Sequence, residues 1–189
     1  MKTVAFVFGR MAPVTVGHLK LIKALAAQQA DDHFVYLSHS FDPKKNPLSY
    51  EQKLEYVRAA VDEHEPKVTV VNSDSRTAID VLKELSGRYD QVIFVAGDDR
   101  VADFTRMFNA YNGRPDKKGV ILYSFDSIDV VSAGERDEAS DDVTGASASK
   151  MRAAAEADDY SSFAKMAPFS NEAIIKKMYN DVRKGMGVI

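Results

Sequence analysis

The stretch VAFVFGRMAPVTVGHLKLIKAL, residues 4–25 of this 189-residue chain, decides the fold. Its first five residues are apolar and rich in β-branched and aromatic side chains, which is typical of a buried strand. After a loop that begins with Gly9, the apolar residues Leu19, Ile22 and Leu25 recur at helical spacing. A strand followed at once by a loop and a helix is the first part of a parallel βαβ unit, so this stretch predicts an α/β fold.

The same alternation of strand and helix signals continues along the chain. Further apolar runs predict four more strands, at Phe34–Leu37, Val68–Val71, Val92–Ala96 and Val120–Ser124. Helical spacing predicts helices around Leu54, Val57 and Val61, around Ile79, Leu82 and Leu85, and around Val101, Phe104 and Phe108. We therefore expect a doubly wound, Rossmann-like, five-stranded parallel sheet with helices on both faces, and a ligand beyond the carboxyl ends of its strands.

The C-terminal part of the chain is expected to be helical after one irregular segment. Residues 128–143 are acidic and lack helical periodicity, which predicts a surface loop. A short helix is expected at residues 149–157 and a longer one at 171–184, capped by Ser170 or Asn171 and stopped by Gly185. We divide the chain into an α/β domain, residues 1–160, and a C-terminal helical extension, residues 161–189, packed on the same domain.

Composition excludes several classes of function. Lys and Arg number 25 against 28 Asp and Glu, a net charge of −3, whereas dedicated DNA binders carry a clear basic excess. The absence of cysteine excludes disulfides, thiolate catalysis and Cys-ligated zinc. No apolar run is long enough to span a bilayer and no export signal is recognisable, so we expect a soluble, cytoplasmic protein without a membrane partner.

The loop after the first strand has the features of a phosphate site. Gly9 would let a ligand approach the backbone closely, and the amides at the following helix start favour an anion. Thr15 and His18 lie about one helical turn apart and can converge on the same phosphate, while Arg10 adds a permanent cation. The alternative interpretation is a capped turn with an incidental histidine.

A second helix start of this kind lies near the C-terminal end. Ser147 and Ser149 can donate hydrogen bonds to phosphate oxygens, and Lys150 and Arg152 supply positive charge. The alternative interpretation is a serine cap followed by two solvated cations. Two phosphate-type helix starts in one small α/β domain favour a polyphosphate ligand.

Both motifs closely resemble those of the nucleotidyltransferase superfamily that carries the signature (H/T)xGH and, near its C-terminal end, ISSTxxR or SGTxxR. The matching residues are TVGH, residues 15–18, which include Gly17, and SASKMR, residues 147–152. Their order and their predicted strand–loop–helix context also match. The resemblance covers roughly residues 3–160 and leaves the C-terminal helix as an extra element.

Two further segments are similar to members of this superfamily. Residues 42–53 resemble the ENPFTxxER segment of archaeal-type nicotinamide-mononucleotide adenylyltransferases, although Leu48 and Lys53 replace a phenylalanine and an arginine. The run AGDD after the fourth predicted strand is similar to a G(A/S)D element. This similarity implies that Gly97 and Asp98 lie near the bound nucleotide or acceptor.

The resemblance implies a nucleotidyl transfer, in which a phosphate or similar nucleophile attacks the α-phosphorus of a nucleoside triphosphate and pyrophosphate leaves. It assigns His18 and Thr15 to the α-phosphate, and the serines and arginine of the second motif to the leaving phosphates. Arg10 and either Lys44 or Lys45 would balance the remaining negative charge. A Mg²⁺ ion bridging phosphate oxygens is implied, with few or no protein ligands.

The sequence says less about which nucleotide and which acceptor are used than about the type of reaction. Residues 42–53 and the second motif favour ATP, with nicotinamide mononucleotide as the best single acceptor. However, Met11 and Ala12 replace the aromatic–polar pair of many relatives with that activity, and the sequence at residues 13–15 is similar to phosphopantetheine adenylyltransferases instead. A cytidylyltransferase acting on a phosphorylated small molecule is the second enzyme candidate. A nucleotide-binding or structural domain without turnover is the non-enzyme alternative.

Three further expectations concern His39, assembly of the protein and its origin. His39 follows the second predicted strand, at the same sheet edge as the first motif, and is a candidate for contact with the acceptor. Many relatives assemble, which makes a homo-oligomer one expectation. Similar compact nucleotidyltransferases with SxSKMR-type endings occur in viral genomes, and a viral origin would place this protein in the host cytoplasm.

Overall fold

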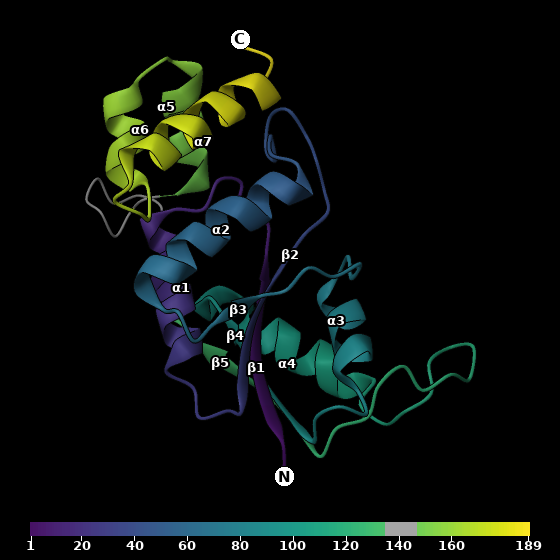
Figure 1. The fold of residues 1–189 in the computed structure, drawn as a ribbon. Helices are drawn as coiled ribbons and strands as arrows, with labels where there is room; N and C mark the ends of the chain where they lie inside the picture. The colour runs from purple at the N-terminus through teal and green to yellow at the C-terminus, as the bar shows by residue number, and fades with distance from the viewer. Residues whose placement is uncertain (135–146) are drawn as a thin grey trace. The chain divides into compact units, whose positions relative to one another are not determined.

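The computed structural model describes residues 1–134 and 147–189, and its central sheet confirms the predicted fold class. The strands are β1 (Thr3–Gly9), β2 (Asp32–Leu37), β3 (Thr69–Val70), β4 (Gln91–Ala96) and β5 (Ser127–Ser132). They form one sheet in the order β3-β2-β1-β4-β5 (Figure 1). β1 pairs in parallel with β4, as do β4 with β5 and β2 with β3. The order reverses direction between β1 and β4, as in other doubly wound sheets.

Helices follow the strands much as the spacing of apolar residues predicts. Their bounds are α1 (Val16–Ala26), α2 (Tyr50–His64), α3 (Ala78–Leu85), α4 (Val101–Ala110), α5 (Ala148–Glu156), α6 (Tyr160–Met166) and α7 (Glu172–Gly185), with a 3₁₀ turn η1 (Asp98–Arg100) before α4. Within the described residues, no helix combines the length and the apolar character needed to cross a bilayer.

The chain divides into two compact units, each built from three segments. The sheet unit consists of Met1–Phe8, Leu21–Tyr36 and Lys67–Glu135. The helix unit consists of Gly9–Lys20, Leu37–Pro66 and Arg136–Ile189. The chain therefore passes from the sheet unit to the helix unit at the last residue of β1 and again at the last residue of β2.

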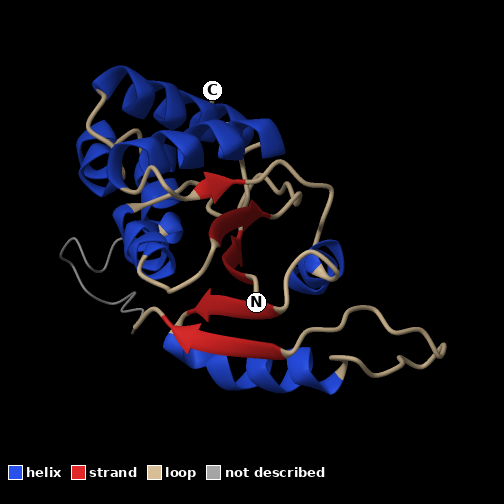
Figure 2. Cartoon of the chain, turned by 60° about the horizontal axis from the view of Figure 1, so that its bottom comes forward, coloured by secondary structure: helices blue, strands red, loops and turns tan. Residues whose placement is uncertain are grey.

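The core of the sheet unit lies between the strands and the pair α3 and α4. Phe94 of β4 is its centre, with ring centroids 4.9 Å from both Phe6 and Phe104 and 5.2 Å from Phe108. Helix α4 runs alongside β5 (Figure 2). Ala5 and Val7, which alternate with Phe6, are also fully buried, so both faces of β1 are covered.

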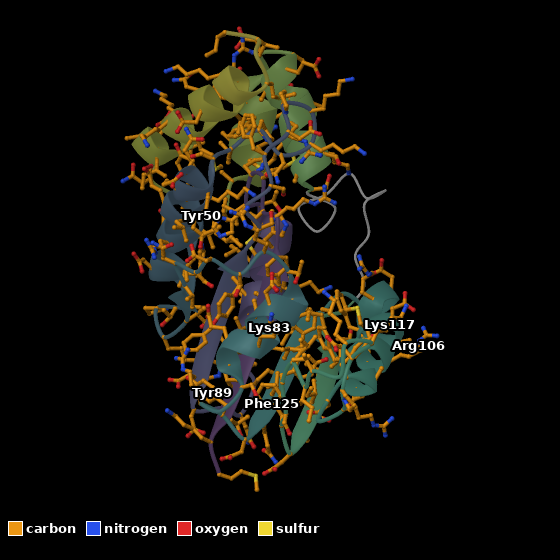
Figure 3. The ribbon with its side chains drawn as sticks, turned by 90° about the vertical axis from the view of Figure 1, so that its right-hand side faces the viewer. Tyr50, Lys83, Tyr89, Arg106, Lys117 and Phe125 are labelled. Atoms are coloured by element: carbon orange, nitrogen blue, oxygen red, sulfur yellow. The ribbon has the colours of Figure 1, made fainter. Side chains whose placement is uncertain are left out.

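The predicted strand at Val120–Ser124 is wrong, because the fifth strand is Ser127–Ser132. Val120 and Ile121 are 51% and 55% exposed and lie in an extended loop near Lys117, whereas Phe125, after the loop, is buried in the core (Figure 3). The predicted irregular loop at residues 128–143 is therefore a strand at its start, and its residues 135–143 lie outside the described part of the chain. An edge strand needs only one buried face, so it alternates polar and apolar residues and lacks the continuous apolar run that we used as the signal.

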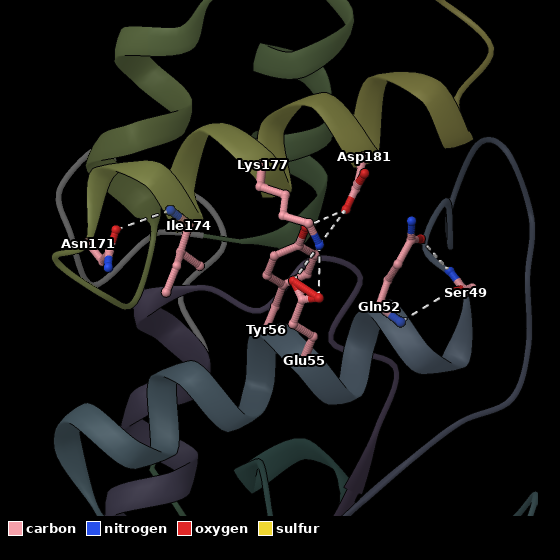
Figure 4. A network of polar contacts seen from close by, with 8 residues as sticks. All are labelled: Ser49, Gln52, Glu55, Tyr56, Asn171, Ile174, Lys177 and Asp181. Carbon is pink, nitrogen blue, oxygen red and sulfur yellow. Dashed lines mark hydrogen bonds and ion pairs between the residues drawn. The ribbon is translucent and has the colours of Figure 1, made fainter.

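In the helix unit, α5, α6 and α7 pack on one another, and α7 is joined to α2 by polar contacts (Figure 4). The hydroxyl of the fully buried Tyr56 donates to the carboxylate of Asp181. Beside it, the Lys177 ammonium contacts both oxygens of Glu55, at 2.8 and 2.6 Å. Helix α6 was not predicted because it is short and buries one large apolar side chain, that of Phe163.

Both ends of α7 lie where the sequence predicts them. Asn171 is confirmed as its cap, because its Oδ1 accepts the N–H groups of Ala173 and Ile174. Helix α7 ends at Gly185, where the sequence predicts its stop, but the positive φ of 77° that is typical of a glycine at a helix end belongs to Gly187. A Cβ at Gly185 would lie 1.7 Å from the carbonyl oxygen of Pro47. This glycine is therefore needed for close packing of α7 on the segment that leads into α2.

A substitution tests this close packing. Gly→Ala in an ordinary helix stabilises by about 0.5–1 kcal/mol. We expect Gly185→Ala to lower the free energy of unfolding by about 1–3 kcal/mol instead, because the new methyl group overlaps Pro47. Urea denaturation measures this change, with the exposed neighbour Lys184→Ala as a control that stays within about 0.5 kcal/mol. A Gly185→Ala protein as stable as the wild type would contradict the contact.

Candidate functional site

The start of α1 is closed by reciprocal hydrogen bonds between Thr15 and His18. The buried Thr15 Oγ1 accepts the backbone N–H groups of Gly17 and His18, at 3.0 and 3.3 Å. In return, the Thr15 N–H donates to Nδ1 of His18, at 3.0 Å. This is the logic of a capping box, with histidine in the position usually taken by Glu or Gln. Because Nδ1 accepts a hydrogen bond, the neutral ring carries its proton on Nε2, so His18 is an oriented donor at the helix start.

The loop between β1 and α1 is packed in one specific conformation. Met11, Ala12 and Val14 are at most 2% exposed, and Met11 has a φ of 44°, which is unusual for a residue with a side chain. Such a conformation persists only where its surroundings hold it. At Gly9 an added Cβ would make only ordinary contacts with Met11, at 3.8 Å or more, so close approach of a ligand there stays a prediction.

The second motif meets this loop directly. Ser147 caps α5 by accepting the N–H of Lys150 at 3.1 Å. The half-buried guanidinium of Arg152 donates through Nη1 to the carbonyl oxygen of Ala12, at 2.9 Å, and through Nη2 to Ser149 Oγ, at 3.3 Å. The structure therefore brings both sequence motifs together within the helix unit.

Positive charge accumulates where the motifs meet. Burial lowers the pKa of Arg152, and the charge of Arg10 lowers it further, while Asp42 acts in the opposite direction. Arg10 follows β1 directly and is exposed. Cations that repel one another in this way favour an anionic ligand, which relieves the repulsion.

The loop after β2 is a tight turn that presents two lysines. Asp42 and Asn46 exchange backbone hydrogen bonds of 2.9 and 2.8 Å. Asp42 Oδ1 also accepts the N–H groups of Lys44 and Lys45, at 2.7 and 3.3 Å, and these bonds lower the pKa of the Asp42 carboxyl. The side chains of Lys44 and Lys45 are therefore held on an ordered, exposed turn, and their contact with a phosphate stays a prediction.

Lys53 was noted in the sequence only as a departure from the family pattern, but it is a central residue of this region. Its side chain is fully buried, and Nζ donates to Ser38 O, Ser38 Oγ and Ser40 O, at 3.0, 3.0 and 3.2 Å. Burial, and next the charge of Arg10, lower the pKa of Lys53 to about 8. A sequence signal existed, because Lys53 precedes the buried residues Val57 and Val61 at intervals of four.

His39 lies on the ring of Tyr50, the first residue of α2. The two rings are nearly parallel, at 13°, with centroids 3.8 Å apart. Figure 3 shows Tyr50 on the helix unit. The stack fixes the position of His39, and its contact with an acceptor stays a prediction.

Gly97 and Asp98 belong to the sheet unit, whereas the two motifs belong to the helix unit. They follow β4, and the exposed carboxylate of Asp98 accepts a hydrogen bond from the hydroxyl of Ser132 at the end of β5. A role near the nucleotide stays a prediction for both residues. Within residues 1–134 and 147–189, there is no group of three or more His, Asp or Glu side chains that could hold a metal ion.

Comparisons with known proteins concern the family and the fold of the chain. The model of the cytidylyltransferase-like family matches residues 6–164. A search of curated proteins by sequence found no match. Among solved structures, the chain is similar to a nicotinic acid mononucleotide adenylyltransferase from Plasmodium falciparum in complex with NaAD, with 16% identity, a TM-score of 0.62, and coverage of 95% of this chain and 96% of that one.

Two other solved structures are larger than this chain. One is a bifunctional NMN adenylyltransferase/ADP ribose pyrophosphatase from Francisella tularensis, with 15% identity, a TM-score of 0.60, and coverage of 99% of this chain and 53% of that one. The other is TmcAL from Thermotoga maritima bound with alpha-thio ATP, with 12% identity, a TM-score of 0.54, and coverage of 100% and 56%. At these identities the likeness establishes the shared fold.

The cap at Thr15 can be tested by its effect on stability. Thr15→Val keeps the shape of the side chain but leaves two N–H groups of α1 without their acceptor, so we expect a loss of about 2 kcal/mol in the free energy of unfolding. Thr15→Ser keeps the oxygen and should lose less than about 1 kcal/mol, the value of one buried methyl group. A Thr15→Val protein as stable as the wild type by urea denaturation would mean that the cap contributes nothing to stability.

Proposed function

Because the chain belongs to the cytidylyltransferase-like family, we propose that it is a nucleotidyltransferase that moves an adenylyl group from ATP to a phosphate-bearing acceptor. Nicotinamide mononucleotide is the best single candidate for the acceptor. The observation that supports the proposal best is the hydrogen bond from Arg152 to the Ala12 carbonyl, because it joins the two segments to which we assign phosphate binding. The adenylyltransferases of the same fold support the choice of ATP.

In the proposed reaction, an oxygen of the acceptor phosphate attacks the α-phosphorus of ATP. The bond from that phosphorus to the β-phosphate oxygen breaks, and pyrophosphate leaves with its electron pair. The protein supplies position and charge rather than a covalent intermediate. His18 Nε2–H donates to the α-phosphate, where negative charge develops.

The remaining charge is distributed over the rest of the site. Arg152, Ser147 and Ser149 bind the leaving β- and γ-phosphates, and the cations Arg10 and Lys44 face the acceptor phosphate or the triphosphate. Magnesium would enter with the triphosphate and would offset part of its negative charge, with few or no protein side chains holding it.

A cytidylyl transfer is the second candidate, and the description of the matching family model favours it. A thermal-shift comparison of ATP, CTP, GTP and UTP with magnesium separates the candidates, because a ligand that binds the native state raises its melting temperature. We expect the largest shift with ATP. A shift with CTP alone would favour the cytidylyl reaction, and nucleotide binding without pyrophosphate release from a broad panel of acceptors would favour a domain without turnover.

His18 provides the first test of the chemistry. With magnesium, ATP and nicotinamide mononucleotide, we expect the wild-type protein to release pyrophosphate and His18→Ala to lower kcat by about 10²–10³-fold, the usual effect of one lost transition-state donor. His18→Gln retains an N–H near the position of Nε2 and should lose less. An unchanged kcat in His18→Ala, measured by a coupled pyrophosphate assay, would remove His18 from the mechanism.

Arg152 provides a second test, based on ligand charge. We expect Arg152→Ala to weaken ATP binding at least tenfold and AMP binding much less, because Arg152 is assigned to the β- and γ-phosphates. The matched control is Arg106→Ala, whose side chain is 75% exposed and pairs with Asp103 in the sheet unit. Calorimetric titration measures both affinities, and equal losses for ATP and AMP would place Arg152 elsewhere.

A further inference from the structure

We propose that Lys53 is a positioning residue of the transfer site, a buried cation that fixes the loops after β1 and β2 and so holds Arg10 ready for an anionic substrate. The proposal rests on the nucleotidyl transfer proposed above and names a residue that this mechanism does not use. It is carried by four hydrogen bonds and by the charge of Arg10 beside a buried ammonium.

Lys53 does not contact a substrate in this arrangement. An ammonium has three donors, and all three are accounted for by Ser38 O, Ser38 Oγ and Ser40 O, at 3.0, 3.0 and 3.2 Å. The side chain is also 0% exposed. A ligand could reach it only by displacing these contacts, so Lys53 acts through the residues that it holds.

Ser38 links Lys53 to the loop that carries the first motif. Its N–H donates to the carbonyl oxygen of Gly9 at 2.9 Å, and Gly9 immediately precedes Arg10. Lys53 binds Ser38 twice and Ser40 once, so one side chain at the start of α2 fixes both loops. The backbone from which Arg10 projects is thereby tied to α2.

The charges around Lys53 indicate that it serves an anion-binding site rather than the stability of the fold. Among the described residues, Lys53 forms no ion pair with a carboxylate. The charged group that acts on it is Arg10, from the loop after β1, and the loop after β2 offers it only uncharged groups of Ser38 and Ser40. A buried cation beside another cation is costly to the fold, and an anion bound at Arg10 would offset that cost.

Lys53→Met tests the role, because it keeps the length of the side chain and removes its charge and its donors. We expect the variant to fold, to bind inorganic tripolyphosphate and ATP at least tenfold more weakly at pH 7, and to show a lower kcat per folded molecule. The matched control is Lys177→Met, an exposed lysine of α7 that pairs with Glu55, which should keep wild-type binding and turnover.

The pH profile separates positioning from a merely structural role. In the wild type, binding and turnover should fall as the pH rises through about 8, where Lys53 loses its proton, and this fall should be absent in Lys53→Met. With rising pH, the free energy of unfolding should change in the opposite direction to binding and turnover. The pKa of Lys53 in the folded protein lies below its unfolded value of 10.5, so between these values the unfolded chain binds more protons, and wild-type stability relative to Lys53→Met should rise.

The outcomes are distinct. A variant with lower stability but wild-type affinity, kcat and pH profile would overturn the positioning role. If the wild type binds tripolyphosphate and ATP but transfers nothing, the proposed function fails, while the affinities and their pH dependence still decide the role of Lys53. If the wild type binds neither anion, both proposals fail.

Discussion

A single hydrogen bond, from Nη1 of Arg152 to the carbonyl oxygen of Ala12, joins segments that lie 140 residues apart and carry the two motifs of this protein. Its donor is charged and half-buried, which makes such a bond stronger than one between neutral, exposed groups. Its acceptor belongs to a loop with an unusual backbone conformation at Met11. The bond therefore helps to stabilise that loop and places the start of α5 beside it.

Around this bond, the cations have different tasks. The half-buried Arg152 and the fully buried Lys53 donate hydrogen bonds to oxygen atoms of the protein. Arg10 is exposed and acts on both of them through its charge. A net charge of −3 for the whole chain conceals this local excess, because opposite charges elsewhere contribute to the sum but not to the local potential.

Much of the fold could be predicted from the sequence, and the errors have physical causes. β1 and β4 are buried runs of apolar residues, and α1 to α4 have clear apolar stripes, so local patterns suffice to find them. β5 was misplaced because an edge strand alternates, and α6 was missed because it buries little. The end of α7 at Gly185 is predicted correctly, but the sequence does not show that the backbone of Pro47 excludes a side chain there.

The candidate site shows the same division between local and long-range information. By itself, the sequence determined the alternation of strands and helices and both helix starts, because caps such as Thr15 and Ser147 act over three residues. The tertiary structure alone decided that Arg152 reaches Ala12 and that Lys53 binds Ser38 and Ser40. Burial and long-range hydrogen bonds depend on which distant segments meet, so the same lysine is a solvated charge in one fold and a buried clamp in this one.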